Sequence, residues 1–134
     1  MDNLDVKYEG QEVVIGGKTY ILPDLGYGAY EDHDAFAKII NIGLALEKQK
    51  ADVLNNPIPK EVFADIRELI YLALKRNYPD LTMEELKDAL GLGSALLAVT
   101  KLIQREMEVN ERLAAELEKN VGKQPAPAKK QTRR

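Results

Sequence analysis

A short connection between two helices, residues 74–86, constrains the fold of this chain more than any other segment. The residue before a proline avoids the α-helical region, so Tyr78 followed by Pro79 predicts the end of one helix. Thr82 with Glu85 three positions later has the pattern of a capping box, which predicts the start of the next helix. The segment therefore predicts two helices joined by a tight turn, and nothing in it is chemically reactive.

The N-terminal part predicts a β-hairpin over residues 11–22. Gly16 and Gly17 form the two-residue turn, which requires positive φ angles. The resulting register pairs Val13 with Tyr20, Ile15 with Lys18, and Val14 with Thr19. A single hairpin is marginally stable in water, so its apolar face must lie on the helices or on the sheet of another chain. Residues 23–30 are expected to form a loop.

Apolar residues at helical spacing predict three or four helices after this loop. The first begins near Asp32 or Asp34, and its expected buried positions are Phe36, Ile39, Ile40, Gly43, Leu44 and Leu46. The second spans 60–76, and its expected buried positions are Val62, Phe63, Ile66, Leu69, Ile70, Ala73 and Leu74. The third is short, over 82–90, and the fourth runs from a Ser94 cap to about residue 120, with a solvated or partner-bound outer half.

Length and pattern together predict one small domain that is mainly α-helical with an N-terminal β-hairpin, an α+β fold. Residues 1–10 are expected to be a flexible lead-in, 11–120 the helical domain, and 121–134 a disordered basic tail. The domain is expected to end in a long C-terminal helix. A continuous coiled coil along that helix is poorly supported, because Glu106 and Asn110 fall on its apolar seam.

Composition narrows the classes of function. The chain has no cysteine, no apolar run long enough for a membrane span and no secretory signal, which together favour a cytosolic protein. The net charge of −3 hides an asymmetry, because six basic residues and no acidic ones lie in 119–134. The rest of the chain has thirteen basic against twenty-two acidic residues. Such an acidic body repels nucleic acid.

The sequence offers little for catalysis, and we expect no enzyme, no metal and no cofactor. The single histidine, His33, lies between two aspartates at a predicted helix start, where acidic residues are usual as caps. Adjacent residues on a helix do not converge on one metal ion. The single serine, Ser94, is expected to be a helix cap, and no glycine cluster has the spacing of a phosphate-binding loop.

Residues 81–94 also suggest a helix-turn-helix, with a recognition helix over 94–104. The first turns of that helix are apolar and offer no donors to base edges. Lys101, Gln104 and Arg105 come too late in the helix to contact bases from its N-terminal end. A small DNA-binding regulator therefore stays an alternative function.

The sequence Leu-Lys-Arg-Asn-Tyr-Pro-Asp-Leu-Thr at 74–82, with Glu-Glu-Leu after it and a Gly-Leu-Gly-Ser break at 91–94, resembles the tail assembly chaperones of long-tailed bacteriophages. The glycine-turned hairpin running into Pro23 is also similar to the start of many members. The resemblance covers roughly residues 11–105. It implies a non-enzymatic protein of the host cytoplasm that binds the tape measure protein, helps recruit tail tube subunits and is absent from the mature virion.

Candidate partner-binding residues are apolar or aromatic positions in excess of a small core: Tyr27, Tyr30, Leu96, Val99, Ile103, Leu113 and Leu117. Ordinary core packing is the alternative for each of them. A homo-oligomer is also plausible, because a lone hairpin needs a partner, and the sequence fixes no number of copies. A third possible function, besides the chaperone and the DNA-binding regulator, is a structural protein of the virion tail.

Overall fold

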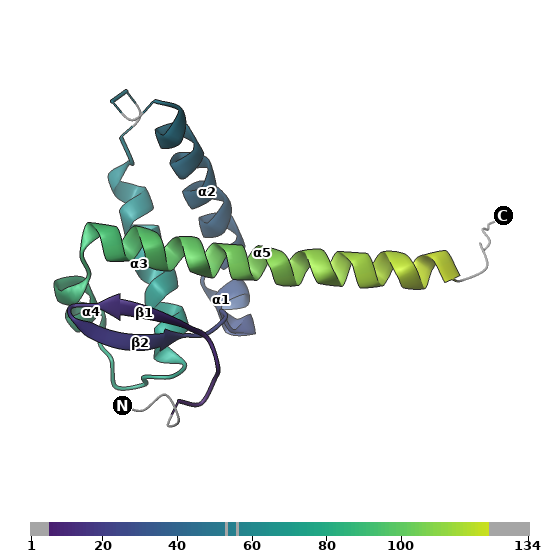
Figure 1. The fold of residues 1–134 in the computed structure, drawn as a ribbon, viewed down its shortest axis with the longest axis horizontal. Helices are drawn as coiled ribbons and strands as arrows, with labels where there is room; N and C mark the ends of the chain where they lie inside the picture. Colours follow the sequence, from purple (N-terminus) through teal and green to yellow (C-terminus); the bar gives the residue numbers. More distant parts are fainter. Residues whose placement is uncertain (1–5, 53, 56, 124–134) are drawn as a thin grey trace. The chain divides into compact units, whose positions relative to one another are not determined.

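The computed structural model describes residues 6–52, 54–55 and 57–123. Its elements are β1 (Gln11–Ile15), β2 (Lys18–Leu22), α1 (Tyr27–Asp32), α2 (Ala35–Ala51), α3 (Lys60–Lys75), α4 (Met83–Ala89) and α5 (Leu92–Lys123) (Figure 1). The fold is mainly α-helical with an N-terminal antiparallel hairpin, as predicted. Contacts divide the chain into two units, residues 1–103 and 104–134.

The predicted hairpin register is confirmed. Val13 pairs with Tyr20, Val14 with Thr19, and Ile15 with Lys18. Gly16 and Gly17 both have positive φ, 60° and 77°, which glycine adopts at no steric cost. Val13 and Ile15 are buried in the same core cluster as the helices, so the apolar face of the hairpin rests on the chain's own helices.

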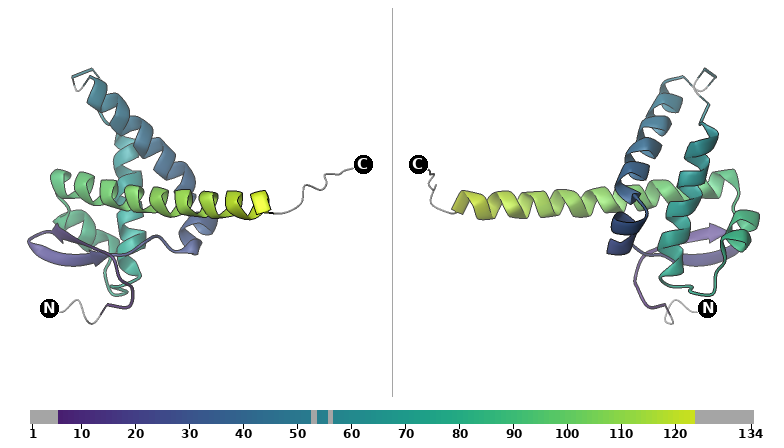
Figure 2. Two further views of the ribbon diagram at one scale, coloured as in Figure 1. Left: turned by 45° about the vertical axis from the view of Figure 1, so that its right-hand side comes forward. Right: turned by 180° about the vertical axis from the view of Figure 1, so that it is seen from behind.

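The core of the first unit forms around α3. Its predicted positions Val62, Ile66, Leu69, Ile70, Ala73 and Leu74 are all buried, whereas Phe63 remains 38% exposed. Ala95, Ala98, Val99 and Leu102 of α5 join the same cluster. The hairpin and α4 lie at the C-terminal end of α3, away from the connection between α2 and α3 (Figures 1 and 2).

One prediction about the first helices is wrong and another holds in part, because α2 begins directly after Asp34 as predicted. A short helix, α1, occupies Tyr27–Asp32 where a loop was predicted. The N-cap of α2 is Asp34, but its side chain accepts no capping hydrogen bond, because its backbone is left-handed with φ 52°. Aspartate tolerates this conformation better than most residues, which lets the chain turn directly from α1 into α2.

The predicted capping box of α4 is confirmed. The Glu85 backbone N–H donates to Thr82 Oγ1 at 3.1 Å, and the Thr82 backbone N–H donates to Glu85 Oε1 at 3.0 Å. The predicted Ser94 cap is wrong, because α5 begins two residues earlier, at Leu92. The Ser94 hydroxyl accepts from the Gly91 N–H at 3.1 Å and thereby binds the residue before the helix.

The helix α5 continues to Lys123, beyond the predicted end near residue 120. Of the predicted basic tail, residues 124–134 lie outside the described part of the chain. The predicted flexible lead-in is described from Val6 onward, and there Tyr8 forms two backbone hydrogen bonds with the Asn77 side chain.

Candidate functional site

The Asn77–Tyr78 pair that carries the family resemblance joins the hairpin to the helices. The Asn77 side chain accepts from the Tyr8 N–H at 2.7 Å and donates to the carbonyls of Tyr8 and Ile21 at 2.8 and 3.2 Å. The Tyr78 hydroxyl accepts from the Ile21 N–H at 2.8 Å. The Tyr78 ring meets Tyr20 edge to face, with centroids 5.1 Å apart. The resembling sequence thus has a structural role at this joint.

These contacts also bind one residue on an outer edge of the hairpin. The backbone N–H and C=O of Ile21 face away from β1, and Tyr78 and Asn77 bind both of them. On the other edge, Lys101 Nζ donates to the Glu12 carbonyl at 3.1 Å. Covered edges disfavour pairing with a strand of another chain. Strand addition is therefore disfavoured at Ile21 and at the Glu12 carbonyl.

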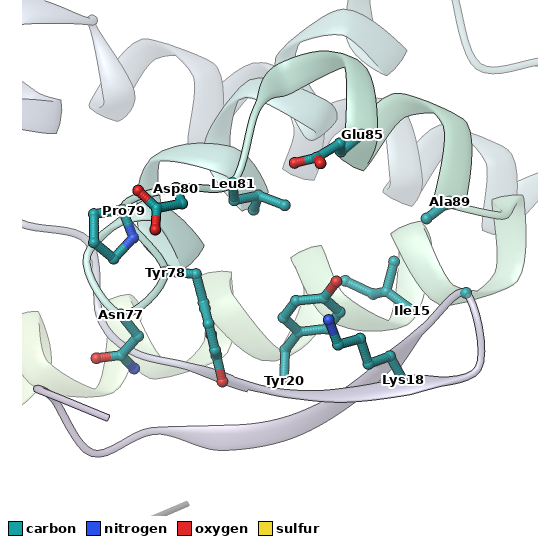
Figure 3. Close-up of a pocket in the computed structure, with 11 residues that line it drawn as sticks. Ile15, Lys18, Tyr20, Asn77, Tyr78, Pro79, Asp80, Leu81, Glu85 and Ala89 are labelled. Carbon is teal, nitrogen blue, oxygen red and sulfur yellow. The ribbon is translucent and has the colours of Figure 1, made fainter. Parts of the chain in front are cut away.

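An open cleft of about 640 Å³ lies between β2, the 77–81 connection and α4 (Figure 3). Ile15, Tyr20, Leu81 and Ala89 form its apolar lining, and Lys18, Asn77, Asp80 and Glu85 its polar lining. The carboxylate of Glu85 serves the α4 cap and the amide of Asn77 binds backbone. The Glu85 and Asn77 side chains of the cleft therefore stabilise the fold.

A second cluster ties the N-terminal segment to the end of α3. The Arg76 guanidinium carbon lies 3.9 Å from the centre of the Tyr8 ring, and Arg76 Nη1 donates to the Asp24 carbonyl at 2.6 Å. Hydrogen bonding, from Lys7 first and then from Arg76, lowers the pKa of the Tyr8 hydroxyl below its ordinary value. Tyr8 is half-buried, and its contacts with Arg76 hold the N-terminal segment at the end of α3.

His33 lies in a polar cluster with Lys38 and with Glu68 of α3. Its Nδ1 lies 3.4 Å from Glu68 Oε2, and Lys38 Nζ lies 3.7 Å from the other oxygen of the same carboxylate. Within the described residues, no group of three or more histidine, aspartate or glutamate side chains could hold a metal ion. None of the helices in these ranges has a stretch that is both long and apolar enough to cross a bilayer.

The predicted partner-binding residues fall into three classes of exposure. Tyr27, Leu113 and Leu117 are exposed, at 79%, 57% and 64%. Tyr30, Leu96 and Ile103 are half-buried and pack against the core, and Val99 is fully buried in it. Val99 is therefore a core residue in this structure, while Tyr27, Leu113 and Leu117 are accessible to a partner.

The sequence analysis missed an apolar surface on α2. Phe36, Ile40 and Leu44, which were predicted to be buried, are 60%, 45% and 60% exposed. We call these three residues the α2 stripe. The buried side of α2 instead consists of Ala35, Ile39 and Ile42. The available signal was that residues 35–46 contain only two polar side chains, Lys38 and Asn41, since a helix that is apolar all round needs covering on every side.

The helix-turn-helix interpretation meets a steric obstacle. Ala95, Ala98 and Val99, in the first turns of the expected recognition helix, are buried in the core cluster. A recognition helix must instead present its N-terminal residues to the major groove.

No protein-family model, curated protein or solved structure matches this chain.

We expect Tyr78→Phe to lower the free energy of unfolding by about 1–1.5 kcal/mol, because the Ile21 N–H loses its acceptor. The measurement is urea denaturation followed by circular dichroism. Tyr27→Phe removes the same hydroxyl from an exposed ring and is the matched control, expected to change stability by less than about 0.5 kcal/mol. Equal midpoints for the two variants would contradict the role given to the Tyr78 hydroxyl.

Proposed function

We propose that this chain is a tail assembly chaperone of a long-tailed bacteriophage, which binds the tape measure protein and keeps it soluble. The proposal rests first on the resemblance of residues 11–23 and 74–94 to that family. In this proposal the chain has no enzymatic activity, acts in the host cytoplasm, also contacts the major tail tube protein and leaves before the virion is complete.

The observation that carries the proposal is the exposed apolar surface on the outer half of α5. Leu113 and Leu117 lie one helical turn apart and are 57% and 64% exposed. The residues around them from 111 to 119 are exposed as well. Two leucines one turn apart on an exposed helical stretch are a suitable contact for an apolar stripe of another helix.

The chemistry of the expected client suits this surface. A tape measure protein is a long helical protein, and before the tail tube forms its apolar stripes are open to aggregation. Many weak helix-to-helix contacts cover such stripes and can later be released. The excess of acidic residues outside positions 119–134 gives a complex of the two proteins a net charge that opposes aggregation.

The test is co-expression of the full chain with the tape measure protein encoded beside it, measuring the soluble fraction of that client and its co-purification. We expect the double variant Leu113→Asp and Leu117→Asp to reduce client recovery by about tenfold or more, because two charges replace apolar contacts. The melting temperature of the first unit should stay the same, since both leucines are exposed.

The matched control is Ala115→Asp with Lys119→Ala, which changes the net charge equally at exposed positions of the same helix. This control should retain the client. Equal loss in the two double variants would contradict the role of the leucines. A client that stays insoluble and unbound beside the unmodified chain would contradict the proposed function, and finding the chain in purified particles would contradict its departure from the virion.

A further inference from the structure

The α2 stripe is an apolar surface that the described part of the chain leaves uncovered. Its three side chains are spaced four residues apart on one face of a 17-residue helix. The opposite face of α2 is already buried against the core through Ala35, Ile39 and Ile42. A helix with apolar residues on both faces is stable in water when a partner covers the second face.

The order of residues along the stripe is symmetric about Ile40. Phe36 and Leu44 lie four positions on either side of it, and the small residues Ala37 and Gly43 lie three positions on either side. A second copy of α2 running in the opposite direction therefore places Phe36 opposite Leu44, Ala37 opposite Gly43, and Ile40 opposite itself. This self-complementarity is the property that an isologous two-fold interface requires.

The surface also has room for a close approach. A Cβ atom added at Gly43 would have no neighbour within 4 Å, and Ala37 is exposed. Small residues beside the large ones allow two helix axes to come near each other while the large side chains interdigitate. An extended patch of this kind also fits a helix better than it fits a small ligand.

The charges at the two ends of α2 favour the same antiparallel direction. Asp32 and Asp34 are exposed at its N-terminal end. Lys48 and Lys50 are exposed at its C-terminal end, together with the acids Glu47 and Asp52, the C-cap residue. An antiparallel pair brings the acidic N-terminal end of one copy to Lys48 and Lys50 of the other, and it keeps the two acidic ends apart. A parallel pair would bring the two acidic N-terminal ends together.

We propose that two copies of this chain associate through the α2 stripe, with the two α2 helices antiparallel about a two-fold axis at Ile40. This interface is independent of the proposed chaperone function, because the leucines assigned to the client lie in residues 104–134 and the α2 stripe lies in the first unit.

The first test measures the mass of the full chain by analytical ultracentrifugation over a range of concentrations. We expect a reversible dimer, and we expect Ile40→Lys to raise its dissociation constant about 100-fold or more, because the two-fold axis sets the new charges against each other. Leu97→Lys makes the same substitution at a leucine that is 56% exposed on α5, and it should leave the dimer unchanged. The double variant at Leu113 and Leu117 should also remain dimeric.

The second test uses the absence of native cysteine, so that each introduced cysteine is the sole thiol of its chain. Packed helices lie about 8–10 Å apart with Cα atoms about 2.3 Å from each axis, so facing residues are within disulfide reach. Ile40→Cys should give a disulfide-linked dimer under mild oxidation. Phe36→Cys alone should not, whereas Phe36→Cys mixed with Leu44→Cys should give a mixed dimer. Asp88→Cys, at an exposed position on α4, is the control for random collision.

Each outcome bears on the proposal. A monomer at every concentration would overturn it, and so would an equal effect of Ile40→Lys and Leu97→Lys. Efficient cross-linking of Phe36→Cys to itself would overturn the antiparallel arrangement. A dimer that survives Ile40→Lys but is lost in the Leu113 and Leu117 variant would place self-association on the outer part of α5 instead.

Discussion

Replacing Asn77 with alanine should lower the free energy of unfolding by about 3 kcal/mol. The Asn77 side chain makes three hydrogen bonds, one accepted from the Tyr8 N–H and two donated to the carbonyls of Tyr8 and Ile21. Alanine leaves all three backbone groups without this partner in a half-buried position. A loss of this size is a large fraction of the stability of a small domain, which is typically about 5–15 kcal/mol. Urea denaturation followed at the helical circular-dichroism band measures it.

The matched control is Asn55→Ala, which removes an exposed asparagine whose contacts are to its near neighbour Asp52. We expect it to change stability by less than about 0.5 kcal/mol. Asn77→Asp is a sharper variant, because the carboxylate keeps an acceptor for the Tyr8 N–H but faces the carbonyls of Tyr8 and Ile21. It should destabilise at least as much as alanine at neutral pH. Stability close to that of the unmodified chain in both Asn77 variants would contradict this account of the joint.

Local sequence signals predicted the parts of the fold that local chemistry determines. Two consecutive glycines fix the hairpin turn, and the turn fixes the register of Val13 with Tyr20. Thr82 and Glu85 form their capping box within four residues of one another. The buried face of α3 also follows from helical spacing, except at Phe63, which is 38% exposed. In each case the contacts that decide the structure lie within one element or one turn.

The two faces of α2 could not be separated in this way. Phe36 and Ile39 are both apolar, but they differ in burial. Ile39 belongs to the core cluster that includes α3, whereas Phe36 is exposed. Position 34 likewise looked like an ordinary cap, but the connection from α1 places its backbone in the left-handed region, with φ 52°. These outcomes depend on tertiary packing, which propensity and periodicity do not encode.

The candidate site was predictable only in part for the same reason. Leu113 and Leu117 lie in a charged stretch, and that composition correctly indicated an exposed helix. Val99 lies at helical spacing, and such spacing does not distinguish a core residue from an exposed interaction residue. In the structure Val99 is fully buried in the core. The α2 stripe was missed because its members match the buried pattern of a core helix.

Gly10→Ala should lower the free energy of unfolding by about 3 kcal/mol, near the upper end of what overpacking costs. A Cβ atom at Gly10 would lie 2.1 Å from the carbonyl oxygen of Leu22 and 2.4 Å from its carbonyl carbon. Both atoms are backbone at the end of β2, so the clash cannot be relieved by a side-chain rotation. The chain must instead shift where the lead-in passes the hairpin, which also strains the contact between Tyr8 and Asn77.

Gly93→Ala is the control that isolates this steric effect. A Cβ atom there has no neighbour within 4 Å, and the residue lies in the first turn of α5, where alanine loses less conformational freedom on folding than glycine does. This variant should be more stable than the unmodified chain by about 0.5–1 kcal/mol. If the glycine-to-alanine change lowers stability at Gly10 and raises it at Gly93, the steric clash at Gly10 is the cause. Equal effects at the two glycines would show that the lead-in does not pass Leu22 as closely as the structure places it.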